Sequence, residues 1–233
     1  MTRLRFEGVS KTFVRHLHGG ASLPVLQQAT FHVEGGECVV LTGPSGTGKS
    51  TLLKLAYGNY RAEGGRVLLQ HGDHETDISA GDPRAVLAAR HTLIGYVSQF
   101  LSVIPRIGAL ELVTTAAKAA GHDAPERCAQ EMLARLRLPE ALWPLPPSTF
   151  SGGERQRVNI AIGMVGRHPI LLLDEPTASL DKANREVVVE LVREKRAAGA
   201  AILAIFHDQD VREAVATRTI DVAAFAPQPG VAA

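Results

Sequence analysis

The stretch GPSGTGKST, residues Gly43–Thr51, lies between an apolar run and a segment with helical spacing. It fits the pattern G-x-x-x-x-G-K-[ST], which needs a strand before it and a helix after it. CVVLTG, residues 38–43, is typical of a buried parallel strand, and KSTLLKLAYGNY, residues 49–60, predicts a helix. Gly46 and Gly48 permit backbone conformations that turn successive N–H groups toward one anion. The stretch therefore predicts a phosphate-binding loop in an α/β protein.

The chemistry of bound nucleotide assigns roles within this loop. Lys49 supplies a point charge to the β- and γ-phosphates, Ser50 offers its hydroxyl to Mg²⁺, and Thr51 can reach the α-phosphate. The other loop residues expected to bind nucleotide are Gly43, Pro44, Ser45, Gly46, Thr47 and Gly48. A glycine-rich turn that merely precedes a lysine is the alternative, and the flanking strand and helix patterns argue against it.

A second motif, PILLLDEPTASLD, residues Pro169–Asp181, begins with an apolar strand. The strand delivers Asp174 at its C-terminal end, where open parallel sheets bind their ligands. We expect Asp174 to hold Mg²⁺ through water, and Glu175 to orient or deprotonate an attacking water. Two solvated acids at a strand end are the alternative, which the phosphate loop disfavours.

A third motif, FSGGERQRVNIA, residues Phe150–Ala161, places a serine and two glycines at a predicted helix start. Ser151 can offer a hydroxyl and Gly153 an N–H to an anion, and Gly152 lies between them. A capping box completed by Glu154 is the simpler reading, and it is compatible with anion binding. These three residues, Ser151, Gly152 and Gly153, are called the signature residues below.

Bulk composition limits the function classes. The 233 residues carry 25 Lys and Arg against 24 Asp and Glu, a net charge of +1, so no long-range field favours nucleic acid. The two cysteines, Cys38 and Cys128, form neither a disulfide framework nor a zinc motif. No apolar run approaches the ~18 residues of a membrane span. We expect a cytoplasmic protein without direct membrane insertion.

The order of patterns predicts one domain over residues 1–225 and a flexible tail over 226–233. Strand-like segments come first, and helical spacing with an Ala, Glu, Arg and Leu bias predicts a helical subdomain over about 101–148. From Pro169, strands and helices alternate, which is typical of a parallel sheet covered by helices.

The phosphate loop, the signature residues, the LLLDEPTASLD strand and a histidine after a later strand, in this order, resemble the ATP-binding cassette family. The resemblance implies a P-loop ATPase with a RecA-like parallel-sheet core, an N-terminal antiparallel β part and a helical subdomain. It also implies ATP and Mg²⁺ as cofactors. In that family the signature residues close on the ATP of a second, head-to-tail subunit, which here is either a copy of the chain or a sister ATPase.

The resemblance carries roles to four more residues. Gln99, in VSQF, resembles the glutamine that senses Mg²⁺ and the attacking water, and His207, in AIFHD, resembles the switch histidine on the γ-phosphate. Asp181, in SLD, resembles the acid that couples the two sites of the dimer. Phe13, in VSKTF, is placed like the aromatic that stacks on adenine. The implied catalytic residues are Glu175, His207 and Gln99.

Several positions depart from the general family pattern. Phe150 stands where leucine is commoner, and Ile162 stands where many members carry arginine. Neither residue is expected to contact phosphate, so the ATPase chemistry is expected to survive. The segment VRHLHGGASLP, residues 14–24, is longer than the usual turn and is a candidate partner contact. HGDHETD, residues 71–77, has metal-binding residue types, but a polar hairpin turn is the preferred interpretation.

Longer stretches are similar to one group within the family. Four stretches resemble the cassette-type subunits of the bacterial carbon–phosphorus lyase system for phosphonate breakdown: FVRHLHGGASLPVL of the long first hairpin, SQFLSVIPRIGALELV, LPEALWPLPPSTFSGGERQRVNIA and GAAILAIFHD. The resemblance implies lyase core subunits as partners and support for forming ribose 1-phosphonate 5-triphosphate. No residue of this chain is assigned to that displacement chemistry.

Two other functions stay open. An energy-coupling subunit of a membrane transporter is one, because the long first hairpin also resembles lipoprotein-release exporters and VIPRIGALELV lies where a permease would dock. A structural cassette that binds ATP without cleaving it is the other, and the presence of Glu175 and His207 disfavours it.

Overall fold

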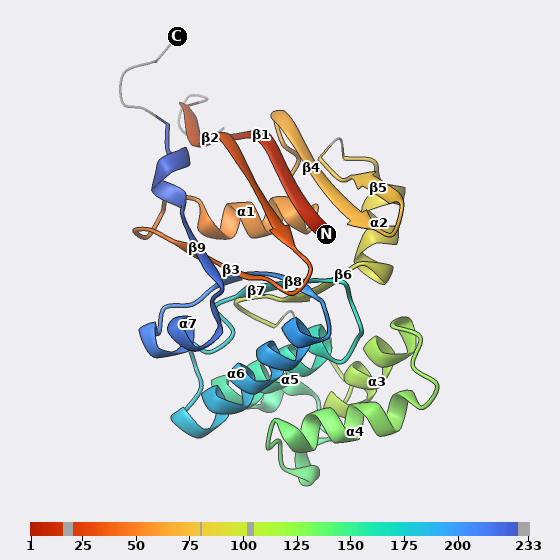
Figure 1. Cartoon of the computed structure of the whole chain (residues 1–233). Coiled ribbons are helices and arrows are strands. Elements are labelled where there is room, and N and C mark those ends of the chain that lie inside the picture. The colour runs from red at the N-terminus through yellow and green to blue at the C-terminus, as the bar shows by residue number, and fades with distance from the viewer. Residues whose placement is uncertain (16–20, 80, 102–104, 228–233) are drawn as a thin grey trace.

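The computed structural model describes residues 1–15, 21–79, 81–101 and 105–227, and it contains two sheets (Figure 1). The first is antiparallel, with strand order β2-β1-β4-β5. Its strands are β1 (Thr2–Arg15), β2 (Ala21–Glu34), β4 (Gly64–His71) and β5 (His74–Asp77). The resemblance to cassette ATPases implies such an N-terminal antiparallel part, and the structure confirms it.

The second sheet is parallel and has the order β6-β7-β8-β3-β9. Its strands are β3 (Cys38–Thr42), β6 (Ile94–Val97), β7 (Ile170–Asp174), β8 (Ala201–Ile205) and β9 (Arg218–Asp221). All residues of β7 and β8 are buried, which explains why these segments read as continuous apolar runs. The predicted parallel core is therefore confirmed.

Helices cover both faces of the parallel sheet. The α-helices are α1 (Lys49–Ala56), α2 (Pro83–Thr92), α3 (Ala109–Ala119), α4 (Pro125–Arg135), α5 (Gly152–Met164), α6 (Lys182–Ala197) and α7 (Gln209–Val215). Short 3₁₀ turns span Glu140–Leu142, Pro147–Thr149 and Val222–Phe225. Helix α1 lies between the two sheets, and α5 and α6 lie on the opposite face of the parallel sheet (Figure 1). The layers are therefore sheet, helix, sheet and helices.

Two apolar clusters hold these layers together. One joins both sheets through Leu52, Leu53 and Leu55 of α1, which are all fully or almost fully buried. The other packs α3 to α7 beneath the parallel sheet, and α3 and α4 contact each other and α5. The first cluster holds the helix that follows the phosphate loop, and the second holds the helix that carries the signature residues at its start.

The signature helix approaches the sheet closely because two glycines face each other. A Cβ on Gly163 of α5 would lie 2.6 Å from Val97 Cγ2 and 2.7 Å from the carbonyl oxygen of Tyr96. A Cβ on Gly95 of β6 would lie 2.5 Å from the carbonyl oxygen of Gly163. Such separations are far below ordinary contact distances, so both positions require glycine. This contact fixes α5 against the strand that leads to Gln99.

Some local predictions differ from the structure. The helix expected over 49–60 ends at Ala56, since Gly58 takes a φ of 72° and reverses the chain. The elements α2, β5 and β9 have no clear periodicity in the sequence. The strands β5 and β9 are each only four residues long, which is too short to show one. The predicted flexible tail lies outside the described residues from position 228 onward, and so does the tip of the first hairpin.

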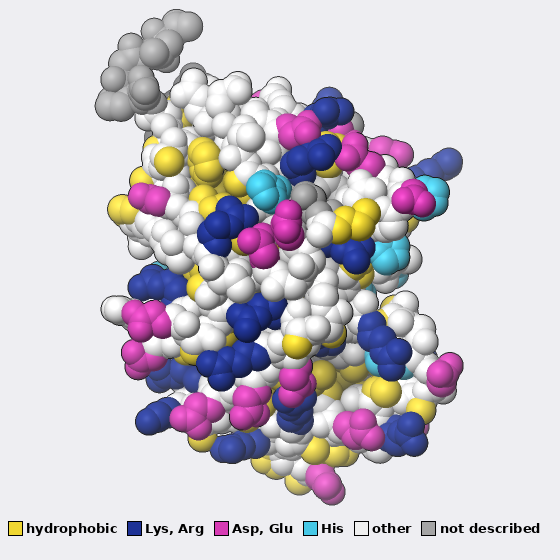
Figure 2. Space-filling model, in the orientation of Figure 1, with side chains coloured by type: hydrophobic (Ala, Val, Ile, Leu, Met, Phe, Trp, Pro, Cys, Tyr) yellow, Lys and Arg dark blue, Asp and Glu magenta, His cyan; other side chains and the backbone are white. Residues whose placement is uncertain are grey.

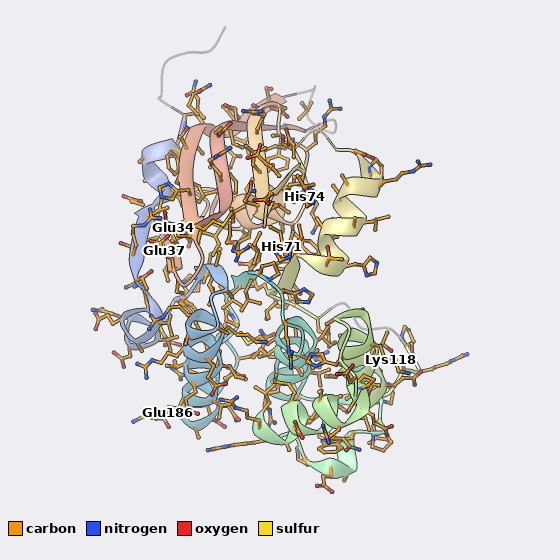
Figure 3. The ribbon with its side chains drawn as sticks, turned by 45° about the vertical axis from the view of Figure 1, so that its right-hand side comes forward. Glu34, Glu37, His71, His74, Lys118 and Glu186 are labelled. Atoms are coloured by element: carbon orange, nitrogen blue, oxygen red, sulfur yellow. The ribbon has the colours of Figure 1, made fainter. Side chains whose placement is uncertain are left out.

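The HGDHETD segment forms a hairpin turn, as the sequence predicts. His71 and His74 pair across the turn between β4 and β5, and Figure 3 shows both at this hairpin.

Basic and acidic side chains are interspersed over the face in Figure 2, in keeping with the small net charge. In the part of the chain that the structure describes, no helix is both long enough and apolar enough to cross a membrane.

We predict that Gly163→Ala lowers the free energy of unfolding by about 2 to 3 kcal/mol, because the added methyl must displace β6 from α5. Denaturant unfolding at equilibrium measures this change. Gly152→Ala is the matched control: it lies on the same helix, and nothing stands within 4 Å of its added Cβ. Equal losses of stability in the two variants would contradict the close contact.

Candidate active site

The candidate site lies at the C-terminal edge of the parallel sheet. Four neighbouring strands, in the order β6-β7-β8-β3, end there. The loops that follow them carry, in the same order, Gln99, Glu175, His207 and the phosphate loop. Parallel pairing therefore places side by side four segments that are far apart in the sequence, at the edge where such sheets bind ligands.

The phosphate loop adopts the conformation that its glycines predict. Gly43, Gly46 and Gly48 have φ values of 124°, 83° and 101°. Gly48 is the N-cap of α1 and makes no side-chain cap bond, so the first N–H groups of the helix face no capping side chain. A helix start of this kind favours an anion through both its N–H groups and its macrodipole.

Lys49 lies across this loop. Its Nζ donates to the carbonyl oxygens of Gly43 and Pro44, each at 2.7 Å. The ammonium group is thus held over the loop by two neutral acceptors and has no carboxylate partner among the described salt bridges. A positive charge without an internal counter-ion, above a ring of backbone N–H groups, fits a polyphosphate.

Two of the three residues expected at Mg²⁺, Ser50 and Asp174, contact each other, whereas Gln99 contacts Glu175. Ser50 Oγ donates to Asp174 Oδ1 at 3.1 Å, and Asp174 is only 2% exposed. Burial raises the pKa of Asp174, the nearby Glu175 charge adds to the rise, and the Ser50 hydroxyl opposes it. A buried carboxylate beside a hydroxyl is the oxygen donor set that Mg²⁺ takes together with water and phosphate, so the residues fit the ion.

Glu175 is the centre of a polar contact. Its Oε1 lies 2.7 Å from His207 Nε2, and its Oε2 accepts a hydrogen bond from Gln99 Nε2 at 3.4 Å. The backbone of Glu175 has a φ of 52°, which is uncommon outside glycine, and its N–H donates to the carbonyl oxygen of Ile205. The strained backbone turns this carboxylate away from Asp174 toward the other predicted catalytic residues.

One cavity of about 300 Å³ brings these elements together. It is lined by Val25, Ser45, Gly46, Gly48, Lys49, Ser50, Thr51, Glu175 and His207. Val25 is the member that the sequence motifs do not predict. Its Cγ1 would lie 3.0 Å from a Cβ on Gly48, so this residue of β2 forms an apolar wall of the loop.

Phe13 lies elsewhere on the first sheet. Its ring contacts the edge of Tyr60, with centroids 5.2 Å apart, and Lys11 Nζ lies 5.2 Å from its centroid. It does not line the phosphate cavity. A role for Phe13 in stacking on adenine therefore stays a prediction.

The signature residues lie at the start of α5 and do not line the phosphate cavity. Ser151 caps α5 and forms the expected capping box, in which the N–H of Glu154 donates to Ser151 Oγ at 3.3 Å and the N–H of Ser151 donates to Glu154 Oε2 at 2.8 Å. Gly152 lines a cavity of about 420 Å³ together with Gln99 and Glu175. Gly153 packs so closely that an added Cβ would lie 3.1 Å from the carbonyl oxygen of Ser179. Within one chain, the signature residues thus stand apart from the phosphate loop.

Asp181 caps the next helix. It is the N-cap of α6 and accepts hydrogen bonds from the N–H and the side-chain amide of Asn184. The backbone N–H of Asn184 lowers the pKa of Asp181. Arg185 then joins two loops, because its Nε donates to the carbonyl oxygen of Leu180 and its Nη1 lies 3.0 Å from Asp208 Oδ1. No sequence motif predicts the contact between Arg185 and Asp208.

A phosphate loop, a buried acid beside the loop serine and a second acid between a histidine and a glutamine define a P-loop ATPase site. Comparison with known proteins agrees. The ABC transporter family matches residues 26–178. The lipoprotein-releasing system ATP-binding protein LolD of Maricaulis maris is 37% identical over 211 residues, which cover 89% of each chain. The chain belongs to the ABC transporter family, and it is an ATPase that binds ATP with Mg²⁺.

Two further similarities extend the comparison. The macrolide export ATP-binding/permease protein MacB of Brucella melitensis is 37% identical over 221 residues, which cover 94% of this chain but 33% of that longer protein. The dimeric structure of MJ0796, a bacterial ABC transporter cassette, superposes with a TM-score of 0.82 at 26% identity, covering 94% of this chain and 95% of that one. A dimeric post-hydrolysis state of MJ0796, bound to ADP and Pi, gives the same TM-score at 25% identity and the same coverage.

We predict that Asp174→Asn makes the protein without metal more stable at neutral pH, because it removes a buried charge. A raised folded pKa means that the burial penalty is absent below the unfolded value of 3.8 and complete above the raised folded value. The advantage of the variant should therefore grow as the pH rises through that window. Thermal unfolding at a series of pH values, with EDTA, measures it.

The same substitution should remove the extra stabilisation that Mg²⁺ adds to ATP. Thermal shift with ATP, in the presence and absence of Mg²⁺, provides this second readout. An Asp174→Asn variant that is less stable than wild type at neutral pH would contradict the burial argument.

Proposed function

We propose that this chain closes with a second ABC subunit into a head-to-tail ATP sandwich and that hydrolysis reopens it to drive a partner. The observation that carries the proposal is the separation of the two anion-binding elements. The phosphate loop lines one cavity and Gly152 lines another, and Glu175 borders both. The start of the signature helix lies apart from the phosphate loop of its own chain. It is therefore suited to bind the nucleotide of a second subunit. The dimeric MJ0796 structures support this arrangement.

The residues of this chain supply the chemistry of hydrolysis. Lys49 and the N–H groups of the loop bind the phosphates, and Ser50 and Asp174 hold Mg²⁺, which neutralises developing charge when bound. Glu175 accepts a proton from, or orients, the attacking water, and Gln99 positions it. His207 must exchange its bond to Glu175 for a bond to the γ-phosphate, so nucleotide binding frees the carboxylate for its role.

We predict that Ser151→Arg leaves nucleotide affinity unchanged and abolishes ATP-dependent dimerisation. The substitution adds bulk and removes a hydroxyl at a surface that only the second subunit's nucleotide reaches. Light scattering with ATP and Mg²⁺ measures association, and a fluorescent nucleotide measures affinity. Loss of affinity in the monomer would show instead that the signature residues act on the nucleotide of their own chain.

The partner should dock in a groove beside the site. A cavity of about 690 Å³ reaches from Gln99 and Asp174 to an apolar wall formed by α3, by α5 and by Leu101 and Ile107, which precede α3. The wall residues are Leu101, Ile107, Leu112, Ala116, Ala119 and Ile162, with Glu111 among them. A segment inserted here would contact the loop of Gln99, so its movement and the state of the nucleotide would be linked.

The most direct reading of the comparisons is a membrane transporter. The similar proteins include a lipoprotein-releasing ATP-binding protein and a macrolide export ATP-binding/permease protein. We therefore propose an ABC transporter permease as the partner, with a short segment of it in the groove. The substrate of such a transporter is not assigned by any residue of this chain.

A second candidate rests on a resemblance of a few stretches of the sequence, and the curated relatives LolD and MacB favour the transporter over it. SQFLSVIPRIGALELV, LPEALWPLPPSTFSGGERQRVNIA and GAAILAIFHD resemble PhnL, the ABC-type subunit of the carbon–phosphorus lyase system. In this second proposal the same closure acts on the lyase core subunits and supports formation of ribose 1-phosphonate 5-triphosphate. The ATPase chemistry is the same for both partners, so only the identity of the partner separates them.

We predict that Glu175→Gln, with ATP and Mg²⁺, holds the closed state and retains the partner. Affinity purification from the source cells, grown with phosphonate as the sole phosphorus source, identifies what it retains. Recovery of a permease supports the transporter reading, and recovery of lyase subunits supports the second candidate. The Ser151→Arg, Glu175→Gln double variant is the control, since it cannot close. Equal recovery by both variants would contradict ATP-driven closure.

A further inference from the structure

Helix α5 carries two amide side chains in the protein interior. Gln156 is 5% exposed and Asn159 is 4% exposed, although the residues around them are mostly apolar. Buried amides are costly unless their donors and acceptors are paired. The two lie three positions apart, so they are neighbours on one face of the helix.

These amides form a chain of hydrogen bonds between two loops. Asn159 Nδ2 donates to the carbonyl oxygen of Ser98 at 2.6 Å and to Gln156 Oε1 at 3.3 Å. Gln156 Nε2 donates to the carbonyl oxygen of Pro176 at 3.1 Å. Both ends of the chain are backbone carbonyl groups, which only accept, so each amide has a single orientation that satisfies all three bonds.

The loops that are joined are those of the candidate catalytic residues. Ser98 directly precedes Gln99, and Pro176 directly follows Glu175. The side chains of Gln99 and Glu175 meet at 3.4 Å on the solvent side of the same loops. The buried chain of hydrogen bonds therefore fixes the separation of the two loop backbones on their interior side. The helix that supplies these bonds, α5, is the one that begins with the signature residues.

We propose that Gln156 and Asn159 are positioning residues that hold Gln99 and Glu175 in register with the signature helix. The inference rests on the proposed function, because it gives these loops their catalytic role. A displacement of α5 as the second subunit closes is carried by the two amides to both loops at once. Closure at the signature residues is thereby linked to the geometry of hydrolysis in the same chain.

Apolar packing of α5 cannot substitute for the hydrogen bonds that Gln156 and Asn159 make to the two loops. The glycine contact between Gly163 and β6 holds α5 to the strand further along the helix. The last described pair of β6 and β7 is Val97 with Leu173, so Ser98 and Pro176 lie beyond the point where these two strands pair, although the N–H of Glu175 still donates to Ile205 of β8. A helix of apolar residues in their place would leave two loop carbonyls without these partners, and the loops would lose their fixed separation.

The test is steady-state ATP hydrolysis by Asn159→Ala and Gln156→Met. We expect kcat to fall roughly tenfold in each variant, because small displacements of catalytic groups cost rate, while KM for ATP stays near its wild-type value. In the double variant the loss should be about as large as in the worse single variant, because both substitutions break one chain of bonds. Asn159→Ser replaces Asn159→Ala if the alanine variant does not fold.

Val158→Ala is the matched control. Val158 is fully buried on the same helix, and its apolar side chain cannot donate a hydrogen bond to either loop. It should lower the melting temperature at least as much as Asn159→Ala and leave kcat unchanged. A kcat loss in Val158→Ala equal to that in the amide variants, or unchanged kcat in the amide variants, would overturn the proposal. Glu175→Gln is assayed in parallel: full activity in that variant would instead overturn the proposed function.

Discussion

Parallel pairing of β6, β7, β8 and β3 is the constraint on which the rest of the molecule depends. Each strand ends at the same edge, so four loops from distant parts of the sequence meet without any contact between their own residues being required. The pairing is stable because both faces of the sheet are covered, by α1 on one side and by α5 and α6 on the other. The same strand pairing that buries the sheet therefore also assembles the site.

The cost of this arrangement is concentrated at Asp174 and Glu175. Asp174 ends a fully buried strand, which raises its pKa, and Glu175 adopts a left-handed backbone. Both features are unfavourable in the chain by itself and become useful when Mg²⁺ and polyphosphate are bound, because the ion compensates the buried charge. In the proposed mechanism, the contact between Glu175 and His207 is exchanged for a contact between His207 and the γ-phosphate when nucleotide binds.

Sequence patterns predict the parts of this structure that depend on local chemistry. GPSGTGKST fixes a loop because glycines and a helix start act within nine residues, and ILLLD predicts a buried strand because the four residues before Asp174 are apolar. Contacts made across the fold are beyond such patterns. Val25 reaches the phosphate loop only because β2 crosses above it, and Arg185 meets Asp208 only because α6 and the loop after β8 pack together. Phe13 packs against Tyr60 on the first sheet, and its predicted role in stacking on adenine stays a prediction.

The partner is the point on which local sequence and global similarity differ. LolD of Maricaulis maris and MacB of Brucella melitensis are each 37% identical to the chain, over 211 and 221 residues, and these similarities favour a transporter partner. In the proposed docking, partner choice depends on the groove between α3, α5 and the loop of Gln99, part of whose lining comes from SQFLSVIPRIGALELV. A permease and a lyase subunit would each present a different surface to this same groove. The chemistry of that groove therefore carries more information about the partner than the ATP site does.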